Sequence, residues 1–271
     1  MSVAHEPSPM IPLSEGSSLR TQLFAVWCAP ICSILVLLGW MILARGARPA
    51  AAALTARETA AFFIAHQQGM LIGTLVFAIG CCFLAIWTVQ LGIMIWQIEG
   101  RAPVMAITEI LCGASIVIIV VLNCSFWAAA AYRPGVISPE IVQAENDTAW
   151  LGFLFVGWPL LSLQMISTAV AALRDRGPRP LFPRRLSQAA LGGSVIMATA
   201  AGCGFTKTGP FAFDGVLGYF LPLVIWAAWL NLHAWYMRAG IRRKLGPQGG
   251  PRETNAGGSG ETTANLAPDG V

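Results

Sequence analysis

The sequence has little charge for its length. Of its 271 residues only 11% are Asp, Glu, Lys or Arg, whereas 56% are hydrophobic. A soluble domain of ordinary composition carries roughly a quarter charged residues, which cover the surface that faces water. This shortage excludes a water-exposed surface over most of the chain and favours lipid as its solvent.

The sequence also lacks the short motifs of common catalytic machinery. It contains no phosphate-binding P-loop and no GxGxxG, HExxH or GxSxG pattern, so an NTP-driven machine or a familiar hydrolase is not indicated. The net charge is only +4, and the basic residues are scattered in short segments between apolar stretches. This pattern argues against a nucleic-acid partner.

No CxxC pair occurs among the seven cysteines, and no histidine lies at zinc-binding spacing from them. All seven fall within apolar stretches, so we expect buried thiols that fill space. His66 and His233 fall near opposite ends of the predicted spans, which fits poorly with a haem held between them. We therefore expect no metal site and no cofactor. The cysteines are Cys28, Cys32, Cys81, Cys82, Cys112, Cys124 and Cys203.

Six apolar stretches separate two polar ends. Each is about the 20 residues that a helix needs to cross the hydrocarbon of a bilayer. The first is longer than the apolar core of a cleaved signal peptide, so we interpret it as a retained span. The predicted fold is all-α, a polytopic transmembrane helical bundle. Its spans are 23–44, 70–97, 104–131, 149–173, 187–205 and 215–237, within a membrane domain at 23–238 between disordered tails at 1–22 and 239–271.

The basic residues favour one orientation. Lys and Arg are retained on the cytoplasmic side of short loops, and six crossings place 12 of the 17 basic residues on one side. We therefore expect both ends in the cytoplasm. The residues on that side are Arg20, Arg101, Arg174, Arg176, Arg179, Arg184, Arg185, Arg238, Arg242, Arg243, Lys244 and Arg252.

Helix-start signals and tryptophans support these boundaries. Thr55 and Glu58 have capping-box spacing, which predicts an amphipathic outer helix leading into the second span. Asp147 and Asp214 are expected to cap the fourth and sixth spans. Indole rings favour the headgroup region, and those near predicted span ends are Trp27, Trp40, Trp96, Trp127, Trp150 and Trp235.

Small residues recur every four positions in the fifth span, at Ala190, Ser194, Ala198 and Gly202. Such a face without bulk lets a neighbouring helix approach closely in lipid. In the sixth span, Pro222 removes a backbone hydrogen bond and is expected to bend the helix.

Polar side chains inside the predicted spans are the candidate functional residues, because polar groups in hydrocarbon are costly. Glu109 is the most prominent, about 9 Å into the third span. Gln90, Gln97 and His233 belong to the same half of the bundle, and we expect them to converge on it as one polar pocket. The alternative is that each residue hydrogen-bonds a neighbouring helix and only stabilises the bundle. The candidate ligand-binding residues are Glu109, Gln90, Gln97, Asn123, Gln164, Asn231 and His233.

Two acidic residues lie in predicted loops on the opposite side. Asp147 follows Glu145 and Asn146, and Asp214 ends a compact aromatic segment that begins at Lys207. Two interpretations remain open: a site for a cation or a protein partner, and helix capping.

Distinctive motifs occur at Asn146-Asp147-x-x-Trp150, at Phe182-Pro183-Arg184, and at Thr208-Gly209-Pro210-Phe211-Ala212-Phe213-Asp214-Gly215 followed by Pro222. At these motifs the chain resembles an uncharacterised family of six-span membrane proteins of actinobacteria and proteobacteria, over most of residues 23–238. The family has no established activity or catalytic residue to transfer. The resemblance implies a bacterial cytoplasmic membrane, which 15 arginines against two lysines also suit. The resemblance also implies that members of the family occur in bacteria that degrade sterols and other hydrophobic compounds, which favours an apolar ligand.

Three functions follow from these features, in order of preference. The first is a non-enzymatic membrane protein that binds or helps transport a hydrophobic small molecule, using the polar pocket around Glu109. The second is an accessory subunit that docks a membrane protein partner, or a second copy of itself, through the arginine-rich loop at 174–185 or the fifth span. The third is a membrane-embedded enzyme with Glu109 as an acid or base. The expected partners are the lipid bilayer and one of these ligands, and no nucleic acid.

Overall fold

Long helices make up nearly all of the structure. The computed structural model describes residues 15–245, and no strand occurs within them. Its α-helices are α1 (Glu15–Leu35), α2 (Ala56–Glu99), α3 (Val104–Tyr132), α4 (Pro139–Trp150), α5 (Gly157–Arg174), α6 (Arg184–Ala200) and α7 (Leu221–Leu245). Shorter π or 3-10 segments are η1 (Val36–Leu43), η2 (Leu151–Val156), η3 (Ala201–Phe205) and η4 (Val216–Phe220).

Six continuous helical stretches in the described part of the chain are long and apolar enough to cross a membrane. The predicted all-α bundle of about six spans is therefore confirmed. The side of the membrane on which the two ends lie stays a prediction. α1 and α7 extend into the predicted tails, to Glu15 and Leu245, and the rest of both tails lies outside the described residues. The stretches are Ser18–Leu43, Ala56–Glu99, Val104–Tyr132, Pro139–Arg174, Arg184–Phe205 and Val216–Arg243.

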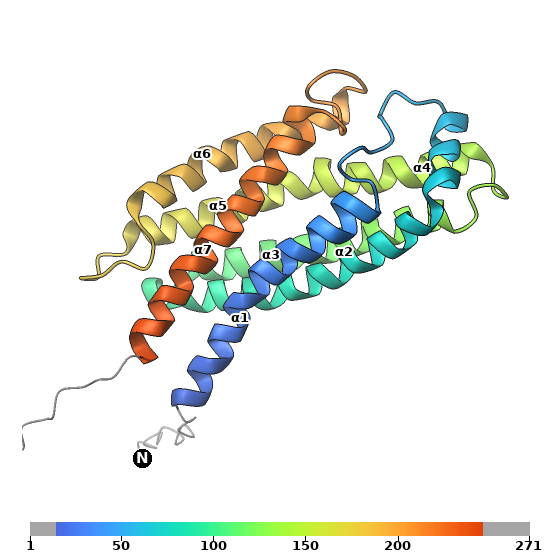
Figure 1. Cartoon of the computed structure of the whole chain (residues 1–271). Coiled ribbons are helices and arrows are strands. Elements are labelled where there is room, and N and C mark those ends of the chain that lie inside the picture. The colour runs from blue at the N-terminus through green and yellow to red at the C-terminus, as the bar shows by residue number, and fades with distance from the viewer. Residues whose placement is uncertain (1–14, 246–271) are drawn as a thin grey trace, which may run out of the picture.

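The six spans pack into a closed ring. α1 contacts α2 and α7, α2 contacts α3, α3 contacts α5, and α5 contacts α6, which returns to α7. The beginning of α1, the end of α7 and the α5–α6 connection all lie at one end of the bundle (Figure 1). We call this the terminal end, and the end that carries α4 the loop end. The ring encloses an interior that α1, α2, α3, α5 and α7 share.

α2 is far longer than one membrane crossing. Its 44 residues extend about 66 Å, more than twice the hydrocarbon thickness. The predicted capping box is confirmed: the Glu58 backbone N–H donates to Thr55 Oγ1, and the Thr55 backbone N–H donates to the Glu58 carboxylate. The backbone departs from helical geometry at His66, where the predicted outer helix joins the second span.

The fourth span begins earlier than the sequence suggests. α4, η2 and α5 form one unbroken helical stretch from Pro139 to Arg174, with Ser138 as the N-cap residue. Asp147 therefore lies inside a helix, and the prediction that it caps this span is wrong, because Ser138-Pro139 starts the helix first. The prediction for Asp214 is also wrong, since Gly215 is the N-cap residue of η4 and no side chain caps it.

π-helical turns stand next to two prolines in the spans. η2 precedes Pro159 by three residues and η4 precedes Pro222 by two. Proline has no backbone N–H and cannot complete the regular hydrogen-bond pattern, so a widened turn on its N-terminal side accommodates it. The bend expected at Pro222 itself stays a prediction.

Large apolar side chains cover the outside of the bundle, as expected where lipid is the solvent. Leu75, Leu111 and Val224 each expose more than 60% of their surface. Six of the seven cysteines are buried as predicted, whereas Cys82 is exposed on this outer surface. In α6 only part of the small-residue stripe is buried, since Ala198 faces outward.

Candidate functional site

Glu109 lies at a junction of three helices inside the bundle. Its Oε1 accepts a hydrogen bond of 2.8 Å from Nε2 of Gln164 on α5. The same nitrogen lies 3.4 Å from Oγ1 of Thr88 on α2, where it also donates. All three side chains are buried, and none of the Glu109 surface is exposed. We call Thr88, Glu109 and Gln164 the Glu109 cluster.

Two glycines let the helices approach closely enough to form this cluster. A Cβ atom added at Gly113, one turn beyond Glu109, would lie 2.5 Å from Nε2 of Gln164 and 2.7 Å from Oγ1 of Thr88. A Cβ added at Gly92 would lie 3.0 Å from Oε2 of Glu109 and would overlap a side chain of α3. The absence of a side chain at both positions therefore makes room for the polar groups.

The second carboxyl oxygen of Glu109 has no partner. Oε2 is fully buried and makes no hydrogen bond within the described chain. No described residue forms an ion pair with this carboxyl either. A polar atom in this setting costs free energy unless it finds a partner. Glu109 Oε2 can therefore engage a polar group of a ligand that reaches it.

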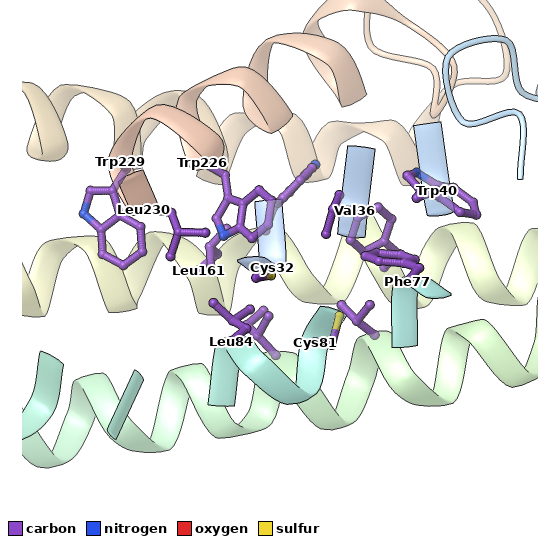
Figure 2. Close-up of a cluster of buried hydrophobic side chains, with 14 of the residues drawn as sticks. Cys32, Val36, Trp40, Phe77, Cys81, Leu84, Leu161, Trp226, Trp229 and Leu230 are labelled. Carbon is purple, nitrogen blue, oxygen red and sulfur yellow. The ribbon is translucent and has the colours of Figure 1, made fainter. Parts of the chain in front are cut away.

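An apolar cavity lies in the middle of the bundle, and none of the three residues of the Glu109 cluster lines it. Its volume is about 30 Å³, and its walls come from η1, α2, α3, η2, α5 and α7. Leu84 and Leu161 in its wall lie about one helical turn from Thr88 and Gln164 respectively, or about 4.5–6 Å along the helices. Figure 2 shows Leu84, Leu161 and Trp226 pointing toward one another across this interior. The cluster thus lies one to two helical turns from the cavity, on its side toward the terminal end.

An aromatic cluster bounds the same interior toward the loop end. Trp40 Nε1 donates a hydrogen bond of 2.8 Å to the hydroxyl of Tyr219, and Trp158 Nε1 donates one of 3.0 Å to the carbonyl of Gly218. Phe213, in the loop before η4, stacks on Trp150, with ring centroids 5.0 Å apart. These contacts close the interior on that side.

The buried aromatic cluster revises the assignment of three tryptophans. Trp40, Trp127 and Trp150 are packed in this cluster with at most 1% of their surface exposed, so they do not form part of a headgroup belt. Helix packing turned them inward although their distance along the sequence suggested span ends.

His233 lies in a separate buried group. Its Nδ1 is 2.8 Å from the carbonyl of Trp229, which can only accept, so Nδ1 carries the proton and Nε2 is left as an unpartnered acceptor. Its ring packs against those of Trp229 and Phe182. No hydrogen bond or ion pair joins His233 to Glu109 in the described part of the chain. An acid–base pair of these two residues is thus not formed.

The remaining candidate residues are distributed over other contacts. Gln90 is buried and donates to Gln22 of α1 at 3.5 Å. Asn231 donates to Ser33 Oγ at 2.8 Å and so joins α7 to α1. Gln97 is exposed and lines a cleft at the terminal end.

Asn123 lies on α3 beyond the cavity, two heptads from Glu109. Its side chain contacts the backbone at Gly152, where a Cβ would overlap it, and its Nδ2 has no hydrogen-bond partner. Of the six other predicted residues, then, only Gln164 meets Glu109 directly.

The two aspartates near the loop end have no capping role. Oδ1 of Asp147, in α4, lies 3.5 Å from Nδ2 of Asn146, a long hydrogen bond. Asp214 is half-buried in the loop before η4. Residues 15–245 contain no group of three or more His, Cys, Asp or Glu side chains placed to share a metal ion.

Sequence reasoning missed Thr88 and the two glycines. A signal was present: Thr88 and Gly92 are four residues apart, as are Glu109 and Gly113. A polar residue followed one turn later by glycine marks a place where a second helix can come close to the polar group. The sequence pattern instead predicted Gln90 for the pocket, because its amide is more polar than a threonine hydroxyl, whereas in the structure Gln90 faces α1.

Comparisons with protein-family models, with curated proteins and with solved structures find no match for this chain. Its candidate site therefore rests on its own geometry. Together, the six apolar helices and the buried polar cluster describe a multi-pass membrane protein with an amphipathic interior.

Proposed function

We propose that this protein binds a hydrophobic small molecule with one polar group inside its helical bundle, and that such binding serves the transfer of that molecule within or across the membrane. The observations that carry the proposal are the unpartnered carboxyl oxygen of Glu109 and an apolar cavity whose wall residues Leu84 and Leu161 lie about one helical turn from Thr88 and Gln164. The apolar part of a ligand fits the cavity walls, and a hydroxyl or carboxyl group can hydrogen-bond Glu109. A sterol or a fatty acid has this chemistry.

A groove between α1 and α7 supplies a route from the lipid. Its volume is about 230 Å³, and Pro30 of α1 and Asn231 of α7 line it. Val36 lies six residues after Pro30, and Trp226 lies five residues before Asn231. Both line the cavity. The Asn231–Ser33 hydrogen bond holds α1 and α7 together between the two spaces. Opening of this contact would connect the groove with the cavity.

The cavity must widen when a ligand enters. A volume of about 30 Å³ holds a group of roughly the size of one water molecule. Leu84, Leu161 and Leu223 in the wall have rotatable side chains, and Pro30 weakens the hydrogen-bond ladder of α1. Ligand entry therefore requires these side chains to rotate and the cavity walls to move apart.

A photoreactive sterol analogue with a free hydroxyl tests the proposal. The full chain in lipid nanodiscs is irradiated with increasing amounts of the probe, and cross-linked peptides are identified by mass spectrometry. We expect saturable labelling of residues at the cavity. Ile116→Trp fills the cavity wall and should abolish the saturable part, whereas Ile118→Trp on the lipid-facing side of the same helix should not. Non-saturable labelling, or equal labelling of both variants, would refute the proposal.

A further inference from the structure

An arginine-lined cleft opens at the terminal end of the bundle, away from the proposed ligand cavity. Its volume is about 580 Å³. The α5–α6 connection, the end of α2 and the last turns of α7 form its walls. Four arginines line it, Arg174, Arg176, Arg179 and Arg243, together with a single acidic residue, Asp175.

The acidic residues near this cleft do not neutralise the arginines. The two carboxylate oxygens of Asp175 accept hydrogen bonds from the backbone N–H groups of Gly177 at 3.0 Å and Leu181 at 2.9 Å. Asp175 thus shapes its own loop. Glu99, at the end of α2, accepts hydrogen bonds from two backbone N–H groups at the start of α3. No arginine of the cleft forms an ion pair within the described residues, so the cleft presents four guanidinium groups to an outside anion.

The depth of the cleft matches the headgroup layer. Trp27, Trp96 and Trp235 are the exposed tryptophans of this end, each with at least 45% of its surface exposed. Exposed indole rings favour the boundary between hydrocarbon and headgroups. Trp96 directly precedes Gln97 in the cleft wall. Met94 and Leu181 add an apolar wall below the arginines.

We propose that this cleft binds the phosphate headgroup of an anionic phospholipid. Guanidinium groups donate to phosphate oxygens in charge-assisted pairs, and basic pockets at the ends of transmembrane helices suit anionic headgroups. The apolar wall accommodates the glycerol and the first acyl carbons, which a soluble phosphate would leave uncovered. This combination favours a lipid over free phosphate as the occupant. The site is independent of the proposed ligand cavity, and either can fail without the other.

Native mass spectrometry of the full chain tests the lipid site. Protein released from nanodiscs of mixed phosphatidylglycerol and phosphatidylcholine should retain the anionic lipid preferentially. Arg176→Gln with Arg179→Gln should reduce this preference about fivefold for each arginine, or about 25-fold together. The matched control, Arg48→Gln with Arg57→Gln, makes the same charge change on exposed residues of the loop end and should leave the preference unchanged.

The double lysine variant, Arg176→Lys with Arg179→Lys, distinguishes the effect of lost positive charge from that of a folding defect. It keeps both positive charges and should preserve most of the preference. A lysine pair as weak as the glutamine pair would overturn the proposal, as would equal losses in the glutamine pair and the loop-end control. Inorganic phosphate is added in a parallel arm. Displacement of the lipid by inorganic phosphate would assign the cleft to a soluble anion and overturn the lipid assignment.

Discussion

Substitution of Gly113 by alanine should destabilise the bundle, although alanine favours helices. The new Cβ would stand 2.5 Å from Gln164 Nε2 and 2.7 Å from Thr88 Oγ1, both well inside van der Waals contact. α2 or α5 must then move away from α3. The movement would break the hydrogen bonds that Gln164 donates to Glu109 and Thr88.

The size of the effect follows from three terms. Overpacking of a filled interior costs about 1–3 kcal/mol. Two interhelical hydrogen bonds in a membrane protein contribute about 0.6 kcal/mol each. Replacement of glycine by alanine within a helix raises the free energy of unfolding by about 0.5–1 kcal/mol. The net loss in the free energy of unfolding is therefore about 1–4 kcal/mol.

Gly192→Ala is the matched control. Gly192 lies within α6, is exposed, and has no atom within 4 Å of an added Cβ. This substitution gains the same helix propensity of alanine over glycine but creates no steric overlap, so it should stabilise the protein or leave its stability unchanged. The difference between the two variants cancels the propensity term and isolates the contact at Gly113, at about 2–4 kcal/mol.

Equilibrium unfolding in mixed micelles measures both variants. The detergent fraction is titrated toward SDS while the fluorescence of the ten tryptophans is followed. The two midpoints should move in opposite directions, or the control should not move. If Gly113→Ala were as stable as Gly192→Ala, the three helices would not meet at the Glu109 cluster as described, and the reasoning would be refuted.

The first two of three further predictions use the same preparation. Gln164→Leu removes the donor to Glu109 and should lower the free energy of unfolding by about 1–3 kcal/mol, while the exposed Gln188→Leu should change it little; equal effects would contradict the cluster. A double-mutant cycle of Trp40→Phe and Tyr219→Phe should give a coupling energy of about 0.6 kcal/mol, and no coupling would exclude their hydrogen bond. A water-soluble, membrane-impermeant maleimide should label none of the seven cysteines in the folded protein in nanodiscs, because six are buried and Cys82 faces lipid, and should label all seven in SDS, as counted by mass spectrometry; labelling in the folded protein would contradict the burial described above.

The proposed acid–base role of Glu109 has less support than ligand binding. Its neighbours are an amide and a hydroxyl, Gln164 and Thr88. His233 belongs to a different buried group with Trp229 and Phe182. The neighbours of Glu109 suit hydrogen bonding to a ligand's polar group more than transfer of its protons.

Composition and local pattern alone determined the class of this protein and most of its spans. Apolar stretches of span length in a chain with 11% charged residues have few alternatives to helices in lipid, because every backbone group must be satisfied within the segment. Local chemistry also predicted the capping box at Thr55 and Glu58. Such features depend on neighbours along the chain, which the sequence displays directly.

Only the tertiary structure decided which polar residues meet. Glu109 was identifiable from its depth in an apolar span, but its partner depends on the rotation of α2 and α5 about their axes. Small differences in packing set that rotation, and they placed Gln164 and Thr88 beside Glu109 while turning Gln90 toward α1. The rotation of the first span took Trp40 into the interior, and that of α2 left Cys82 facing lipid. In hydrocarbon both faces of a span are apolar, so the sequence has no strong period from which the inward face can be derived.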